Sequence, residues 1–231
     1  MERLGVDTTR LELGWREPVV VNAYVHETDR DGARGTGDVT LVDTGLRFNR
    51  RSLPAELRAA GYETGDVDRV LLTHYDLDHV GGVCRFDCPV YLGARDVALV
   101  RGSWDPPLVH HKGLFHRAVR RLVDLSDADL RPVEGGDRIA GFTAHHTPGH
   151  NPGHTAYVHD DGTAFVGDLL WETDGELTTP FWGDSYDMRE LRRSVRRFAD
   201  SAGEVSAICP GHGVPFVRNA DARLRSLADR L

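Results

Sequence analysis

The chain has 231 residues, of which 40% are hydrophobic and 28% are charged, a composition that is ordinary for a globular protein with a sizeable core. The formal net charge of −8 argues against a nucleic-acid partner, because nucleic-acid-binding surfaces concentrate basic residues. No apolar run approaches the roughly 18 residues that span a bilayer, and the first residues do not resemble a signal peptide, so we expect a cytoplasmic protein without a membrane partner.

Runs of β-type residues alternate with helical patterns along the chain. We predict strands, in chain order, at residues 19–26, 39–42, 70–73, 90–92, 138–145, 156–159, 163–166 and 205–208, with a hairpin loop at 28–38. We predict helices that begin at the caps Ser52, Asp187 and Asn219. This mixture of elements favours helices packed on stacked sheets.

A segment at about residues 101–130 interrupts the alternation. Its run Trp104-Asp105-Pro106-Pro107 is incompatible with regular structure, because proline lacks the backbone N–H. Residues 113–125 then carry apolar side chains at helical spacing, which predicts a helix. These side chains are Leu114, Ala118, Leu122 and Leu125. We interpret the segment as an insertion or lid within a single domain that spans residues 1–231.

The run Thr73-His74-Tyr75-Asp76-Leu77-Asp78-His79 is the most informative feature of the sequence, because it places two histidines and two aspartates directly after an apolar run. Other metal-competent residues follow at wide spacing, close to the ends of predicted strands. They are Asp43, His150, Asp168 and His212. Imidazole and carboxylate groups are ligands of zinc and similar ions. Strand ends that converge would therefore bring these residues to one metal centre.

Two metal positions are expected from the spacing within the run. His74 and Asp76 share one side of the backbone, whereas the adjacent Asp78 and His79 can face a second position. Asp168 has two carboxylate oxygens and is therefore suited to bridging two ions. Two ions about 3.5–4 Å apart hold a hydroxide between them, which is the nucleophile that we expect.

In this order the motifs resemble those of the metallo-β-lactamase fold superfamily of hydrolases, over nearly the whole chain. The resemblance implies an α/β fold, namely an αββα four-layer sandwich of two mixed β-sheets flanked by helices, with a site for two divalent metal ions at the sheet edges. It assigns His74, Asp76 and His150 to the first ion, Asp78, His79 and His212 to the second, and Asp168 to both. Asp43 would not touch a metal and would orient the histidine loop from behind.

Asp76 departs from the commonest pattern of this family, in which a second histidine stands two residues after the first. A carboxylate makes the first position harder and more negative, which shifts the preference from zinc toward iron or manganese. Zinc is our expectation for the centre, with iron or manganese as the alternative. Aspartate is also shorter than histidine, so Asp76 binds the metal directly, through water, or not at all.

Together these features predict a metal-dependent hydrolase that uses a metal-bound hydroxide to cleave a small ester, lactone or thioester. Asp78 is the candidate for orienting or deprotonating the water. By analogy with lactonase-like relatives, Tyr186 or Tyr75 is the candidate for polarising the carbonyl or protonating the leaving group. The aromatic segments around Trp104 to His116 and at 179–184 are candidate pocket walls, and they favour a small, partly apolar molecule as substrate.

Two alternatives stay open on the same fold. An iron-dependent oxidoreductase, of the sulfur dioxygenase or di-iron type, is supported by Asp76. A nucleic-acid phosphodiesterase is disfavoured by the net charge of −8. The sequence does not indicate an oligomeric state.

Overall fold

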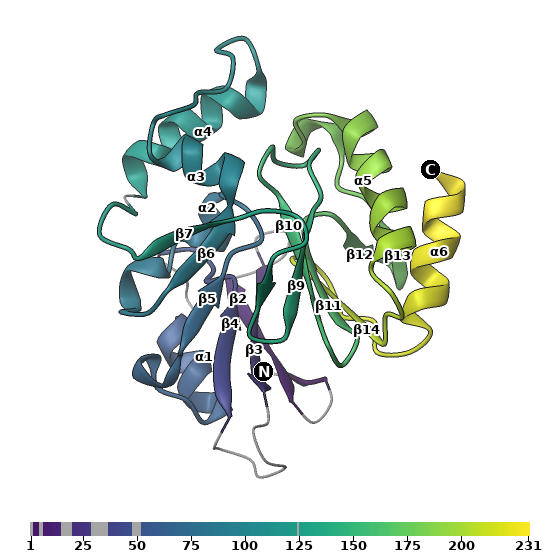
Figure 1. Ribbon diagram of the computed structural model, residues 1–231, viewed down its shortest axis with the longest axis horizontal. Helices are drawn as coiled ribbons and strands as arrows, with labels where there is room; N and C mark the ends of the chain where they lie inside the picture. The colour runs from purple at the N-terminus through teal and green to yellow at the C-terminus, as the bar shows by residue number, and fades with distance from the viewer. Residues whose placement is uncertain (1, 5–6, 15–19, 29–36, 48–51, 124) are drawn as a thin grey trace.

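Two β-sheets pack face to face at the centre of the molecule, and helices cover their outer surfaces (Figure 1). The computed structural model describes residues 2–4, 7–14, 20–28, 37–47, 52–123 and 125–231. Within these ranges the layers follow the order helix, sheet, sheet, helix, so the predicted αββα sandwich is confirmed. Most of the predicted loop at 28–38 lies outside the described residues. No helix in the described part of the chain is long and apolar enough to cross a membrane.

The first sheet has seven strands in sequence order. They are β1 (Glu2–Arg3), β2 (Thr8–Gly14), β3 (Val20–Thr28), β4 (Asp38–Val42), β5 (Arg69–Leu71), β6 (Val90–Gly93) and β7 (Leu130–Val133). Strands β1 to β4 pair antiparallel, whereas β4 to β7 run parallel. The carboxyl ends of these parallel strands therefore lie at one edge of the sheet.

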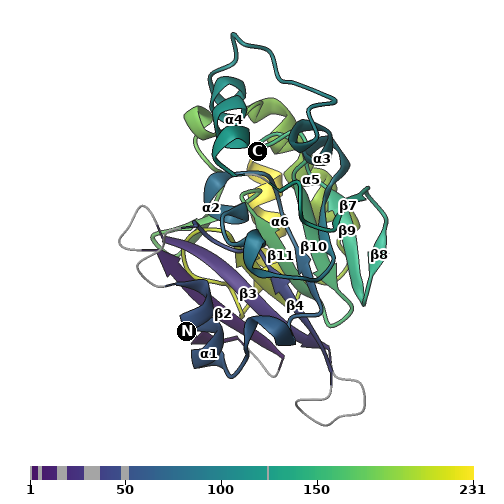
Figure 2. The same ribbon diagram turned by 90° about the vertical axis from the view of Figure 1, so that its left-hand side faces the viewer.

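The helices on the side of the first sheet are α1 (Leu53–Ala60), α2 (Leu77–Val80), α3 (Ala94–Val100) and α4 (His111–Leu122) (Figure 2). Short 3-10 turns η1 (Thr64–Asp66) and η2 (Val83–Arg85) connect elements on the same side. The predicted helix after Ser52 is confirmed as α1. It ends at Gly61, whose left-handed φ of 96° allows the chain to turn away.

The second sheet has five strands in the order β14 (Ala207–Pro210), β11 (Thr163–Gly167), β10 (Thr155–His159), β9 (Phe142–His146) and β8 (Arg138–Ile139). Strand β14 runs parallel to β11, and the other neighbours pair antiparallel. Helices α5 (Met188–Ser201) and α6 (Ala220–Arg230) cover its outer face. A separate hairpin is formed by β12 (Trp171–Thr173) and β13 (Glu176–Thr178).

Apolar side chains join the four layers. Between the sheets, Tyr24 and Val42 of the first sheet meet Phe142 and Phe165 of the second, and the rings of Tyr24 and Phe165 lie 5.5 Å apart in an edge-to-face arrangement. Each such large buried side chain contributes about 1.5–3 kcal/mol. This packing fixes how the two sheets stack, and so it fixes where their strand ends meet.

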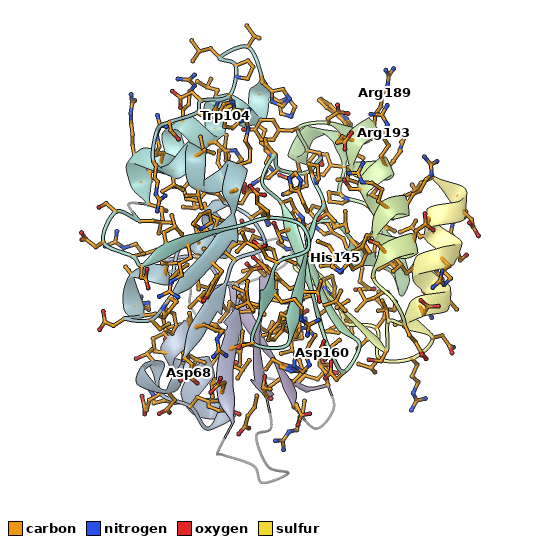
Figure 3. The ribbon with its side chains drawn as sticks, in the orientation of Figure 1. Asp68, Trp104, His145, Asp160, Arg189 and Arg193 are labelled. Atoms are coloured by element: carbon orange, nitrogen blue, oxygen red, sulfur yellow. The ribbon has the colours of Figure 1, made fainter. Side chains whose placement is uncertain are left out.

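Helix α5 shows how a charged run forms a solvated face. Leu191 and Phe198 are buried beneath the helix, whereas Arg189 and Arg193 point to solvent (Figure 3). The Asp187 carboxylate accepts two backbone N–H groups of the first turn, at 2.8 and 3.1 Å. The predicted cap is therefore confirmed at this helix.

Two predicted strands differ from the structure. The prediction of one strand at 138–145 is wrong, because the segment is the hairpin β8–β9. Ala140 and Gly141 adopt left-handed φ values of 48° and 87° there and reverse the chain. The strand predicted at 205–208 is displaced toward the C-terminus, as β14.

Helix α4 turns its polar side inward. The helix was predicted from its leucines, yet Leu114 and Leu122 are 58% and 65% exposed. Its buried residues include Lys112, His116 and Val119. Helix α4 therefore directs a lysine and a histidine toward the strand ends.

The buried Asp96 carboxylate, in α3, ties two loops together near these strand ends. Its Oδ2 accepts the N–H of Tyr75 at 2.9 Å, and its Oδ1 accepts the N–H of Gly153 at 2.8 Å. Tyr75 belongs to the loop after β5, and Gly153 belongs to the loop between β9 and β10. One side chain thus holds a loop of the first sheet against a loop of the second.

We predict that Asp96→Ala lowers the free energy of unfolding by about 2–5 kcal/mol, because each buried N–H left without a partner costs about 1–3 kcal/mol. Urea unfolding of the metal-free protein, followed by circular dichroism, measures this change. Asp127→Ala is the matched control, since Asp127 is exposed. An Asp96→Ala protein as stable as the control would contradict the bridging role.

Candidate metal centre

The predicted ligands lie on loops that follow strands, at one end of the sandwich. Asp43 follows β4, and the run from His74 to His79 follows β5. His150 follows β9, Asp168 follows β11 and His212 follows β14. The structure therefore brings together residues from both sheets that are far apart in the sequence.

Asp43 holds the histidine loop from behind. Its Oδ1 accepts the N–H of Thr73 at 2.8 Å, and its Oδ2 accepts the Thr73 hydroxyl at 2.8 Å and the Nδ1–H of His79 at 2.9 Å. The last contact leaves Nε2 of His79 as the free nitrogen facing the centre. This is the orienting position that the resemblance implied for Asp43, away from the candidate ligand atoms.

The second metal position is formed by Asp78, His79, His212 and Asp168. Nε2 of His212 lies 3.5 Å from Oδ2 of Asp78 and 3.4 Å from Oδ2 of Asp168. Nε2 of His79 lies 3.6 Å from Oδ1 of Asp168. Atoms that share one ion at roughly 2.1 Å lie about 3–4 Å from one another, so these three distances are compatible with a shared ion.

The first metal position is formed by His74, Asp76 and His150. Oδ2 of Asp76 lies 3.5 Å from Nε2 of His74 and 3.2 Å from Nε2 of His150. Oδ2 of Asp168 lies 3.6 Å from Nε2 of His150, so this carboxylate spans both positions. The distances among these ligand atoms alone would admit the predicted bridging arrangement.

Three buried atoms at the centre fit a metal. Nε2 of His74, Nε2 of His79 and Oδ1 of Asp168 have no hydrogen-bond partner among the described residues. A buried polar atom without a partner costs free energy, and an ion at the second position would satisfy Nε2 of His79 and Oδ1 of Asp168. The second position accordingly fits a divalent ion.

Two residues that the sequence analysis did not assign to the metal centre reach the first position from α4. Nζ of Lys112 lies 2.9 Å from Oδ2 of Asp76 and 2.8 Å from Nε2 of His150. Nε2 of His116 contacts the other oxygen of Asp76. Burial alone would raise the pKa of Asp76, but Lys112 and then His116 hold it well below its usual range. The first position is therefore charge-compensated by side chains.

The two candidate tyrosines have different environments. Tyr75 is buried in the core, and its hydroxyl donates to the carbonyl of Val123 at 2.9 Å. The Tyr186 hydroxyl lies 2.7 Å from Nδ1 of His116. Burial, followed by Asp96 and Asp76, raises the pKa of Tyr186 above its ordinary value. Of the two, Tyr186 is the one beside the centre.

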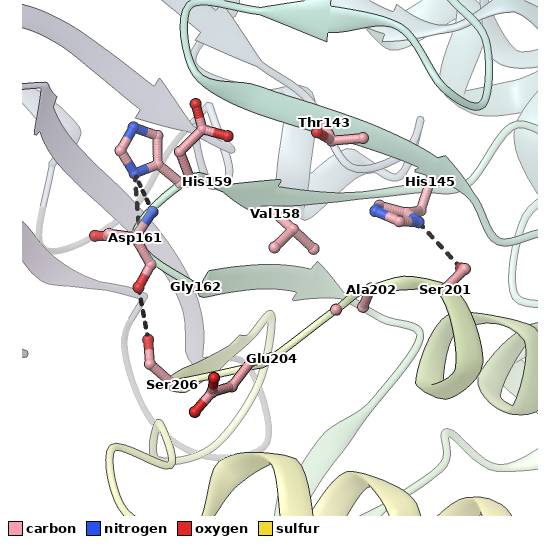
Figure 4. Close-up of a pocket in the computed structure, with 12 residues that line it drawn as sticks. Thr143, His145, Val158, His159, Asp161, Gly162, Ser201, Ala202, Glu204 and Ser206 are labelled. Carbon is pink, nitrogen blue, oxygen red and sulfur yellow. Dashed lines mark hydrogen bonds and ion pairs between the residues drawn. The ribbon is translucent and has the colours of Figure 1, made fainter.

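Other histidines near the motifs lie outside the ligand set. Nε2 of His154 accepts the N–H of Asp168 at 3.2 Å, which is a positioning contact. His145 lines a separate hollow with His159 and Glu204 on the second sheet and approaches Ser201 (Figure 4). None of the residues that line this hollow is a predicted ligand, so we do not assign the chemistry to it.

The acidic ligands raise the pKa of two histidines at the second position. Burial alone would lower both values. For His79, Asp43, Asp168 and Asp78 outweigh burial and raise the pKa to about 10. For His212, Asp168 raises the pKa to about 9. In the metal-free protein both rings are therefore protonated at neutral pH.

We predict that binding of one ion at the second position at pH 7.5 releases about two protons, because metal ligation requires neutral imidazole. The apparent affinity should rise with pH until the pH passes the two raised pKa values. A pH indicator in weakly buffered solution measures the release when zinc is added. His212→Ala should release about one proton fewer; binding without proton release would contradict the arrangement.

Gly211 permits the close approach of the second position to β14. A Cβ at this residue would lie 2.2 Å from Oδ1 of Asp168 and 2.8 Å from Cε1 of His79. We therefore predict that Gly211→Ala weakens metal binding by at least about tenfold, since such overlaps force a shift of the ligands. Competition with a chelating dye measures the affinity. Gly65→Ala is the control, because its Cβ would meet nothing within 4 Å, and equal affinities would contradict the account.

Comparisons with known proteins agree with this geometry. The family profile of the metallo-β-lactamase superfamily matches residues 16–212. The probable metallo-hydrolase YybB of Bacillus subtilis is 30% identical over 197 residues, which cover 80% of each chain. The probable metallo-hydrolase YflN of the same organism is 27% identical over 217 residues, covering 83% of this chain and 81% of YflN.

Solved structures give the same fold. The crystal structure of TTHA1623 in a di-iron-bound form has a TM-score of 0.65 and 31% identity, covering 94% of this chain and 98% of that one. The dizinc quorum-quenching lactonase AidC has a TM-score of 0.61, covering 83% of this chain and 72% of AidC, and at 17% identity its likeness is one of fold alone. The extent of the profile match, together with the site at the strand ends, shows that this chain belongs to the metallo-β-lactamase superfamily.

Proposed function

We propose that this chain is a metal-dependent hydrolase that cleaves a small carboxylic ester, lactone or thioester. The observation that carries the proposal is the convergence of His74 Nε2, His79 Nε2 and Asp168 Oδ1, all buried and without partners in the described structure. A bound divalent ion, zinc in our proposal, supplies Lewis acidity and lowers the pKa of a coordinated water to about 7.

The residues around the ion have distinct parts in this proposal. Asp78 is partly exposed and lies 3.5 Å from His212 at the rim of the centre, where it can orient a water or take its proton. Tyr186 keeps its hydroxyl proton because its pKa is raised by burial. Its hydroxyl is hydrogen-bonded to Nδ1 of His116, whose Nε2 contacts Asp76. These contacts link the Tyr186 hydroxyl to the first position, where we propose that it polarises the carbonyl or protonates the leaving group.

The proposed substrate class rests on exposed apolar side chains near α4 and Tyr186. Residues 108–111, at the start of α4, lie beside residues 181–184, which hold the turn η3 (Trp182–Asp184), with the rings of His111 and Trp182 6.0 Å apart. Leu108, Phe181 and Trp182 are 65%, 60% and 74% exposed in these two segments. Exposed apolar side chains of this kind mark a binding surface, and they favour a partly apolar acyl group.

Asp76 supports a second candidate, an iron-dependent oxidoreductase. Aspartate is a harder ligand than histidine and favours iron relative to zinc. The relative TTHA1623, at 31% identity, has been solved in a di-iron-bound form. The centre would then catalyse a reaction that consumes molecular oxygen, in place of hydrolysis.

The test is turnover of an aryl ester, a γ-lactone and an acyl thioester by purified protein. We predict that chelation abolishes hydrolysis, that zinc restores it, and that His212→Ala lowers kcat/KM by at least about a hundredfold, since loss of a ligand costs more than the ten- to hundredfold typical of its supporting groups. His145→Ala is the matched control, because His145 lies in the separate hollow.

Two results would contradict the hydrolase. The first is hydrolysis by chelated protein at the rate of the metal-loaded protein. The second is oxygen consumption by the iron-loaded protein without hydrolysis of any of the three substrates, which would favour the oxidoreductase.

A further inference from the structure

Lys112 is unusual in both sequence and position. It is the only lysine in a chain that carries 28 lysine and arginine residues in total. It is also 4% exposed, whereas lysine is almost never buried unless it is paired. The ammonium group of lysine is compact, unlike the planar guanidinium of arginine, so it can occupy the position of a metal ion.

The partners of this ammonium group are first-position ligands. Nζ of Lys112 lies 2.9 Å from Oδ2 of Asp76 and 2.8 Å from Nε2 of His150, and it donates to the carbonyl of Asp184 at 2.7 Å. These atoms of Asp76 and His150 are two of the three that would face the first ion. The third, Nε2 of His74, stays without a partner.

The contact between Lys112 and His150 excludes a metal ion from the same nitrogen of His150. A neutral imidazole nitrogen has one lone pair, so Nε2 of His150 either accepts the Lys112 proton or binds an ion. An ion at the first position would also lie within about 3–4 Å of a buried ammonium group, and like charges repel strongly in such a site. The first position therefore does not fit a metal ion while Lys112 lies there.

Asp76 is held to the same arrangement by a second contact from α4. His116 stands four residues after Lys112, one helical turn later and on the same face, and its Nε2 contacts Oδ1 of Asp76. Asn151 donates to the same oxygen at 2.8 Å. Both oxygens of Asp76 are thus engaged by side chains: Oδ2 by Lys112, and Oδ1 by His116 and Asn151.

The second position has no such competitor. Nε2 of His79 and Oδ1 of Asp168 are buried without partners among the described residues, and His212 and Asp78 complete the set. We propose that the ammonium group of Lys112 takes the place of the first metal ion, so that this protein holds a single ion, at Asp78, His79, Asp168 and His212. Helix α4 then supplies the ammonium group of Lys112 to the first position.

The test is the number of ions per chain. Wild-type protein and the variants Lys112→Ala, Lys112→Met and Arg121→Ala are saturated with zinc, freed of excess by gel filtration, and analysed by plasma mass spectrometry. We expect about one zinc ion in the wild type and about two in both Lys112 variants, because removal of the ammonium frees His150 and Asp76 as ligands. Arg121→Ala removes an exposed cation from the same helix and should stay at about one.

Two zinc ions in the wild type would overturn the proposal, and so would a Lys112→Met protein that folds and still holds one. If Lys112→Ala fails to fold, the wild-type and Lys112→Met counts still decide the matter. The result does not depend on the substrate, so the ion count can fail while the hydrolase proposal stands, and the reverse.

Discussion

The carboxylate of Asp43 is the contact on which the centre depends. It lies at the end of β4, in a left-handed conformation with φ of 59°, and accepts three hydrogen bonds from the loop after β5. These bonds set the direction of His79 and the path of the backbone that carries His74 and Asp76. Because parallel strands of one sheet end at the same edge, a single short side chain is enough to fix this loop.

The stacking of the two sheets supplies the remaining ligands. His150, Asp168 and His212 arrive from the second sheet, whose inner face packs on the first through rings such as Tyr24 and Phe165. The packing of the two sheets thus sets the distances between the ligands of one sheet and those of the other. The charge of the centre is then set by α4, which adds Lys112 and His116 to a cluster of aspartates. Metal count and electrostatics therefore depend on an element that lies apart from the sheets.

Much of the fold and the grouping of the candidate ligands could be predicted from the sequence, because both follow from local patterns. The run at Thr73 to His79 and the strand-end motifs have fixed spacing, and alternation of elements indicated the layers. Lys112 and His116 could not be found this way. Helix α4 has leucines at helical spacing, but Leu114 and Leu122 face solvent, and the buried side carries Lys112, which pairs with Asp76. The signal available in the sequence was that Lys112 is the only lysine of the chain.

A metal ion bound at the strand ends is the central requirement of the proposed chemistry, and anomalous diffraction tests for it. Crystals of protein purified without added metal would be measured on both sides of the absorption edges of zinc and iron. We predict an anomalous peak within bonding distance of His79, Asp168 and His212. A peak only at the other histidine cluster, His26, His159 and Asp161, or no ion in zinc-soaked crystals, would contradict the account.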